Sequence, residues 1–455
     1  MSNSLFNEFE PVSAKQWKQK IQFDLKGADY NDALVWTSNE GIQVKPFYHA
    51  EDITAIPKTV KTKTNGFKIC ETLFVANAKN ANTKAQTAIL SGANSIKFII
   101  PSKTISLEEL LKDINLNDVA IHFQLQFLSL EYLNIVSKIS KTSKIYIHTD
   151  IIGQLAKSGN WFFNLKEDFL KFKSTITHLN SFSIHTDLYQ NAGANMVQQL
   201  AYAMAHANEY FNYIENTSKE ITSKTNIVFN VAIGSNYFFE IAKLRALKLL
   251  FNTLKKEYLA DYNCHIFATP SKRNKAIYDY NTNMLRTTTE CMSAILGGAD
   301  TISNLPYDAV FKKHNNFGAR IARNQLLILK HESYFTAVNN PSDGSYYIES
   351  LTEQLAEKAL ILFKDIEANG GFLKQLKNGT IQRKIKESAN KEQEQFNTGN
   401  EVVLGSNKHP NTDDKMKDNL EIYPFVKVEK RKTLIAPIIE KRLTENLEQE
   451  RLKKE

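Results

Sequence analysis

The sequence predicts an α/β fold, a (β/α)8 TIM barrel with an N-terminal extension and a C-terminal helical and linker region. Eight short runs that favour strands alternate with stretches that favour helices, and such alternation produces a parallel sheet with helical crossovers outside it. The runs extend from about residue 65 to about residue 310, close to the roughly 250 residues that such a barrel uses.

The predicted strands are short and rich in β-branched and aromatic residues. They are Lys68–Val75, Ser95–Ile100, Val119–Leu125, Lys144–His148, Ser181–Thr186, Ile227–Ala232, Cys264–Ala268 and Asp300–Ser303. The predicted helices between them carry apolar residues at intervals of three and four. They are Thr83–Ser91, Leu107–Asp113, Glu131–Ser137, Lys166–Thr177, Met196–Ile214, Phe238–Tyr258 and Tyr280–Leu296. The pattern leaves open which of the strand aromatics point into the barrel: Phe98, Phe123, Tyr146 and Phe229.

The N-terminal extension, residues 1–64, carries more aromatic surface than a free tail would expose to water. Its apolar residues include Phe6, Phe9, Trp17, Ile21, Phe23, Leu34 and Trp36. We therefore expect it to contact a partner chain. The alternative is that it packs across the outside of its own barrel, which would bury the same apolar area.

The barrel and the helices that follow it are assigned to residues 65–385, with long helices predicted at Arg320–Lys330 and Leu351–Ala368. Residues 386–455 are assigned to a C-terminal segment. We expect a polar loop or linker over residues 386–418, then an apolar run at Leu420–Val428 and a charged helix at Pro437–Lys454.

Composition excludes several classes of protein. The net charge is +8, but lysine and glutamate are mixed along the C-terminal part, and no nucleic-acid-binding motif is found, so no nucleic-acid partner is expected. No apolar run approaches a membrane span and no secretory signal is seen. Three widely spaced cysteines, Cys70, Cys264 and Cys291, fit a reducing cytoplasm.

Six blocks, in this order, resemble the methylmalonyl-CoA mutase family. They are WTSNEGIQVKPFYHAED (36–52), QNAGANMVQQLAYAMAHANEYF (190–211), FFEIAKLRALKLLF (238–251), YDYNTNMLRTTTECMSAILGGADTISNLPYD (278–308), ARIARNQLLILKHES (319–333) and DGSYYIESLTEQLAEKA (343–359). The resemblance implies a barrel that a substrate arm threads, and adenosylcobalamin as the cofactor that carries the radical chemistry.

The resemblance also shows what this chain lacks. Catalytic members have Gly-Tyr-His-Met-Gln-Glu-Ala-Gly-Ala after the fifth barrel strand, and its histidine donates to the thioester carbonyl. Here Asp187 and Leu188 stand at the tyrosine and histidine positions, and leucine cannot donate a hydrogen bond. The substrate-binding motif Thr-Ile-Arg-Gln-Tyr-Ala-Gly-Phe is missing from residues 53–75. The cobalt-binding motif D-x-H-x-x-G cannot be written anywhere, so the cobalamin-binding domain is expected to be absent.

The resemblance is therefore to the small, non-catalytic subunit of a heterodimeric methylmalonyl-CoA mutase. It implies a large-subunit partner that holds adenosylcobalamin and the acyl-CoA. For this chain alone we expect no activity, no cofactor, no open axial channel, and no catalytic, cofactor-binding or metal residues. Family residues that survive are read as scaffold or relics: Gln190, Gly193, Arg245, Arg286, Glu290, Arg323 and Asn324.

Two alternatives remain. Polar residues at predicted strand ends could form a metal-dependent hydrolase site: His148, Asp150, His185, Asp187 and His265. Such residues are also routine helix caps. Alternatively, the chain could bind acyl-CoA or cobalamin by itself as a sensor, although it has no Gly-rich phosphate loop.

Overall fold

The computed structural model describes residues 8–53, 60, 66–140, 144–217, 224–427 and 430–455. Its main sheet has eight parallel strands in the order β6-β5-β4-β3-β10-β9-β8-β7. The strands are β3 (Lys68–Phe74), β4 (Ser95–Ile100), β5 (Ala120–Leu125), β6 (Ile145–Ile147), β7 (Ser181–His185), β8 (Thr225–Ile233), β9 (Tyr262–Pro270) and β10 (Thr301–Ile302). The predicted strands agree with these to within two residues at either end.

The two edge strands, β6 and β7, lie side by side, so the sheet nearly closes. The amide of Ser183 donates to the carbonyl of Thr149 at 3.0 Å, and the amide of Ile147 donates to the Ser181 hydroxyl at 3.2 Å. The predicted (β/α)8 barrel is therefore confirmed.

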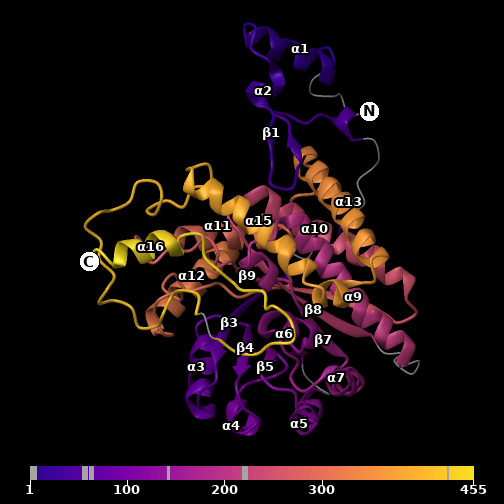
Figure 1. Cartoon of the computed structure of the whole chain (residues 1–455), viewed down its shortest axis with the longest axis vertical. Helices are drawn as coiled ribbons and strands as arrows, with labels where there is room; N and C mark the ends of the chain where they lie inside the picture. The colour runs from indigo at the N-terminus through magenta and orange to yellow at the C-terminus, as the bar shows by residue number, and fades with distance from the viewer. Residues whose placement is uncertain (1–7, 54–59, 61–65, 141–143, 218–223, 428–429) are drawn as a thin grey trace.

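Helices cover the outside of the barrel (Figure 1). They are α3 (Ala78–Leu90), α4 (Leu107–Leu110), α5 (Leu130–Ser140), α6 (Ile151–Ser158), α7 (Leu165–Leu179), α8 (Asp187–Asn191), α9 (Met196–Thr217), α10 (Tyr237–Leu254), η3 (Lys255–Glu257) and α11 (Thr282–Leu296). After the barrel come α12 (Asn316–His331), α13 (Tyr346–Ala368), α14 (Phe372–Lys377), α15 (Thr380–Asn397) and α16 (Glu445–Leu452). None of the described helices is long and apolar enough to cross a bilayer.

The main hydrophobic core lies between the strands and these helices. Phe98 and Phe123 stack there at 6.1 Å, and Phe229 packs edge-on against Phe251 of α10 at 5.7 Å. Three of the four strand aromatics therefore face outward. Tyr146 faces the barrel axis, in a small separate cluster with residues of β3, β8 and β9.

The N-terminal segment reaches away from the barrel at the top of Figure 1, but its hairpin packs on the main core through Ile42, which is fully buried. It contains α1 (Ala14–Asp24), α2 (Tyr30–Leu34), a two-stranded hairpin of β1 (Trp36–Thr37) and β2 (Gln43–Val44), and η1 (Ala50–Asp52). A capping box starts α1, but no residue of this helix is buried. Phe6 lies outside the described residues.

The expected polar linker over residues 386–418 is wrong in its first part, because residues 380–397 form α15. This helix buries Ile381, Ile385 and Phe396, and Val403 and Met416 beyond it are also buried. Only three apolar residues in 18 make up its buried face, which is why the sequence reads as unpatterned.

The predicted C-terminal helix, Pro437–Lys454, is shortened to α16, and the apolar run at Leu420–Val428 forms no helix or strand over its described residues. Residues 434–443 instead bind along the loops that follow the barrel strands. The amide of Ile438 donates to the carbonyl of Ala156 at 2.8 Å, and that of Lys441 donates to the carbonyl of Asn191 at 3.1 Å. These bonds take the place of helical hydrogen bonds.

Candidate functional site

The carboxyl ends of the strands, where barrels carry their chemistry, surround a cavity of about 480 Å³ that we call the mouth cavity. Its walls come from the ends of β3, β4, β5, β8, β9 and β10 and from α12. Its lining includes Cys70, Thr72, Lys97, Ile99, Gln124, Lys157, Asp187, Asn191, Ala232, Thr269, Pro270, Lys272, Ser303, Arg323 and Glu440.

Below the mouth cavity, large side chains fill the barrel axis. Lys97, His122 and Tyr146 are neighbours in the strand register, so they form one inward-facing layer. The His122 ring stacks on Tyr146 at 4.7 Å and lies 4.9 Å from Phe267. His122 is fully buried and Phe267 is 1% exposed. Along this part of the axis the described residues leave no channel for a pantetheine chain, as the sequence predicts.

The axial histidines form a buried hydrogen-bonded chain. Nδ1 of His122 lies 2.9 Å from Nε2 of His148, whose Nδ1 lies 2.9 Å from Oδ1 of Asn230. Burial, helped by neighbouring positive charges, holds the pKa of His122 and of His148 well below the usual value. Both rings are therefore uncharged at neutral pH and serve as polar packing.

Helix α8 and the turn after it form the loop that corresponds to the histidine-bearing loop of the family that the sequence resembles. Leu188 is 3% exposed and packs into the main core. The Tyr189 hydroxyl lies 2.9 Å from Nδ1 of His206, and Gln190 accepts from Lys243 at 2.8 Å. The loop is held in place by buried contacts, while the position of the missing histidine holds an alkyl group.

A glycine is required in this loop. Gly193 has a φ of +100°, and a Cβ there would lie 2.5 Å from Cβ of Ala389 in α15 and 2.9 Å from the guanidinium carbon of Arg273. Helix α15 therefore sits directly on the loop.

The other surviving family residues have structural partners. Arg245 is buried and pairs with Asp343 and, at 2.7 Å, with Glu349. Glu290 pairs with Lys275 at 2.8 Å, with both side chains buried.

Two further family residues that this chain retains, Arg286 and Arg323, also have hydrogen-bond or ion-pair partners. Arg286 donates to Asn283 at 2.7 Å, and Arg323 pairs with Glu71 at 2.6 Å. Asn324 lies within α12. These contacts support the expectation that the survivors are scaffold.

Four of the five residues proposed for a metal site, His148, Asp150, His185 and Asp187, line one cavity, but each is hydrogen-bonded to other groups. Asp150 accepts from the backbone amides of Gly153 and His185 and from Tyr210, and lies 3.0 Å from Nε2 of His206. Burial opposes its ionisation, but His206 and these donors together lower the pKa of Asp150 to about 2.

His185 and Asp187 bond to each other at 3.2 Å beside a second cavity of about 350 Å³, which we call the side cavity. His265 lies elsewhere, 3.0 Å from the Thr301 hydroxyl. Over the described part of the chain, no three His, Cys, Asp or Glu side chains are grouped to hold a metal ion.

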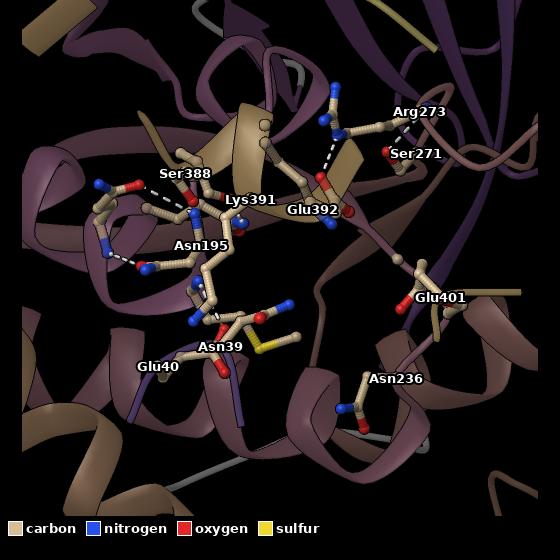
Figure 2. A pocket seen from close by; sticks show the side chains of 18 of the residues that line it. Asn39, Glu40, Asn195, Asn236, Ser271, Arg273, Ser388, Lys391, Glu392 and Glu401 are labelled. Atoms are coloured by element: carbon tan, nitrogen blue, oxygen red, sulfur yellow. Dashed lines mark hydrogen bonds and ion pairs between the residues drawn. The ribbon is translucent and has the colours of Figure 1, made fainter. Parts of the chain in front are cut away.

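A third cavity, of about 430 Å³, lies under α15 and the N-terminal hairpin, and we call it the outer pocket (Figure 2). In Figure 2, Arg273 is joined to Glu392 across it, and Lys391 points into it from α15. The hairpin is attached here, since Asn39 donates to Gln395 at 3.0 Å and the amide of Met196 donates to Glu40 at 3.1 Å. The outer pocket is the junction of three distant chain segments.

The sequence allows lysines near the barrel mouth to bind a CoA phosphate, but it singles out none of the lysines of the mouth cavity. Lys97 is the third residue of SIKFII, and Lys157 and Lys272 follow other strands. A charged residue in the middle of an apolar strand was the available signal, since lysine is almost never fully buried unless it is paired.

The model of the methylmalonyl-CoA mutase family matches residues 101–454. The chain belongs to the methylmalonyl-CoA mutase family. It is 34% identical over 446 residues to the methylmalonyl-CoA mutase small subunit of Porphyromonas gingivalis, covering 90% of this chain and 71% of that one.

More distant relatives are described as methylmalonyl-CoA mutases or as a large subunit. The methylmalonyl-CoA mutase of Cereibacter sphaeroides is 27% identical, over 94% of this chain and 68% of its own length. The large subunit from Streptomyces virginiae is 24% identical, over 90% and 64%. Among solved structures, dihydropteroate synthase from Thermus thermophilus aligns with a TM-score of 0.33 and 10% identity, over 60% of this chain and 98% of that one.

Proposed function

We propose that this chain is the small, non-catalytic subunit of a heterodimeric, adenosylcobalamin-dependent methylmalonyl-CoA mutase. Its large-subunit partner would interconvert methylmalonyl-CoA and succinyl-CoA. One observation carries this proposal: the barrel axis is filled. Catalytic members of the family admit the substrate arm along this axis, whereas here His122, Tyr146 and Phe267 pack against one another in it.

The residues present do not fit the cobalamin cofactor. Two histidines line the side cavity, but His185 is bonded to Asp187 and His148 lies between His122 and Asn230. The cobalt-binding motif is missing from the sequence. The proposal therefore assigns the cofactor and the acyl-CoA to the large subunit.

Two kinds of observation support a partner chain. The relatives named above are described as a small and a large subunit. In addition, the N-terminal segment exposes several large apolar side chains, among them Phe9, Phe23 and Trp36 at 72%, 79% and 51%. We place the complex in the cytoplasm, in keeping with three free cysteines.

Purification of the tagged chain from its native cells tests the proposal. We expect a mutase large subunit to co-purify in equal amount, as measured by native mass spectrometry, and the mutase activity to follow the complex. A chain that purifies without a large subunit from cells that express one would contradict the proposal.

The remaining alternative, a sensor that binds acyl-CoA or cobalamin, has a separate test. Calorimetric titration of the isolated chain with CoA esters and with cobalamin should give no binding heat. Micromolar binding of either ligand would favour the sensor.

A further inference from the structure

Lys97 stands apart from the other buried lysines of the described chain. Lys243 and Lys275 each form an ion pair with a buried glutamate, at 2.6 and 2.8 Å, and Lys248 donates to a backbone carbonyl. Lys97 is 7% exposed, and no described carboxylate lies within ion-pair distance of it. Its hydrogen bond to Oδ1 of Asn230 is 3.4 Å long.

The weak partners of Lys97 do not replace a counter-charge. Oδ1 of Asn230 already lies 2.9 Å from Nδ1 of His148. The second contact is the face of Phe267, whose ring centre lies 4.6 Å from Nζ. Because a buried ammonium is costly without an anion, this position is suited to a negatively charged ligand.

Lys97 is reached from solvent through the mouth cavity, where it lies deep between the strands. Four more lysines line the same cavity: Lys157 after β6, Lys272 after β9, and Lys312 and Lys313 after β10. Lys157 and Lys272 are exposed, and no carboxylate of the described chain forms an ion pair with either of them. Burial lowers the pKa of Lys97; the charge of Asp187 opposes this shift, and the charges of Lys157 and Lys272 add to it.

The carboxylates of the mouth cavity have partners already. Glu71 pairs with Arg323 at 2.6 Å, Asp187 bonds to His185 at 3.2 Å, Asp308 accepts from Asn315 at 2.7 Å, and Glu440 accepts from Asn191 at 3.1 Å. Five lysines and Arg323 line the cavity against these four carboxylates, so positive charge is in excess around it.

The rest of the lining indicates what kind of anion fits. Ile99, Ala232 and Pro270 provide apolar surface beside the hydroxyls of Thr72 and Ser303. Such a wall suits a short carbon chain with charged ends better than a fully hydrated inorganic ion.

We propose that the mouth cavity binds a small organic dianion, with one carboxylate on Nζ of Lys97 and the other near Lys157 and Lys272. Such a molecule supplies the missing counter-charge at the floor of the cavity and a second one at its rim. The filled axis below keeps the site separate from any route for a pantetheine chain.

Isothermal titration of the full chain with succinate tests this site, with succinamide as the uncharged analogue and hydrogen phosphate as the inorganic one. We expect succinate to bind at least tenfold more tightly than either. Equal binding of succinate and succinamide would overturn the proposal, and tighter binding of phosphate would overturn the assignment to an organic acid.

Two variants locate the binding. Lys97→Met should weaken succinate binding at least tenfold. The matched control is Lys68→Met, which removes the same charge from the amino end of β3, away from the cavity, and should change binding less than twofold. Unchanged binding by Lys97→Met would overturn the proposal. Circular dichroism and a thermal melt of each variant verify that it is folded.

Labelling provides an independent measurement. Reductive methylation of the full chain with isotopic formaldehyde, followed by peptide mass spectrometry, reports the accessibility of each lysine. Saturating succinate should slow the labelling of Lys97, Lys157 and Lys272 but not that of Lys68. Equal labelling with and without succinate would contradict the proposed site.

Discussion

At the scale of single residues, this barrel differs from the barrels of the family's catalytic members in the kind of side chain at a few positions. Leu188 replaces a hydrogen-bond donor with an alkyl group, and His122 and Tyr146 occupy the axis with rings. The loop backbone and its buried supports persist around them. These side chains are compatible with a stable fold, since a filled axis packs as an ordinary barrel core does.

Lys97 is expected to reduce stability in the absence of a ligand. Burial lowers its pKa from 10.5 to about 8, opposed in part by Asp187. Below pH 8 the side chain is protonated in both states, so the folded state carries the full penalty, roughly 3 kcal/mol. Between pH 8 and 10.5 the unfolded chain binds more protons than the folded one. Stability from this group therefore rises with pH in that window.

Lys97→Met should consequently raise the free energy of unfolding at pH 7 by roughly 2–4 kcal/mol, because methionine fills a similar volume without charge. The gain should shrink toward pH 10.5. Urea unfolding at pH 7 and at pH 10 measures both values. A variant that is less stable than the wild type at pH 7 would show that the ammonium has a counter-charge after all.

At the scale of elements, α15 and the N-terminal segment are attached in different ways. Helix α15 bears on the loop after β7 and on Arg273, whereas α1 buries no residue and its Trp17 stacks only on Phe47 of the same segment. Helix α15 is therefore part of the folded core, whereas α1 leaves its surface available to a partner chain.

Gly193→Ala should destabilise the chain by roughly 2–5 kcal/mol, since it combines a strained φ with a collision against Ala389. Gly379→Ala is the matched control. Gly379 has a φ of +75° but nothing within 4 Å of its Cβ position, so only the backbone cost of about 1 kcal/mol is expected. Chemical unfolding of both variants measures the difference, and equal losses would show that α15 moves freely away from the loop.

Deletion of residues 1–28 should leave the barrel folded and abolish binding to the large subunit. The deleted part includes all of α1, which contributes nothing to the buried core. Size-exclusion chromatography with the large subunit and a thermal melt of the truncated chain measure the two effects. If the segment only covers its own barrel, the melting temperature should fall while the complex still forms.

At the scale of the whole molecule, the isolated chain should show no mutase turnover with added adenosylcobalamin. The axis is filled and no cobalt-binding motif is present. Leu188→His should not restore activity either, because residues that act as a unit are not additive. A coupled assay for succinyl-CoA measures this, with the assembled complex as the positive control. Turnover by the chain free of any large subunit would contradict the assignment of a silent subunit.

The sequence by itself determined the order and limits of the barrel strands, such as Ser95–Ile100, because strand and helix periodicity is a local property. The six family blocks and the leucine at position 188 could likewise be read from the linear chain.

The tertiary structure alone decided which side chains share a space. Tyr146 faces inward while Phe98 and Phe123 face outward, a polar segment becomes α15, and Lys97 reaches the mouth cavity without an ion-pair partner among the described residues. Several of these arrangements depend on contacts between residues more than a hundred positions apart, such as Gly193 with Ala389 and Lys97 with Phe267. The local sequence pattern does not predict such contacts, because the free energy that selects them comes from packing and desolvation in the closed barrel.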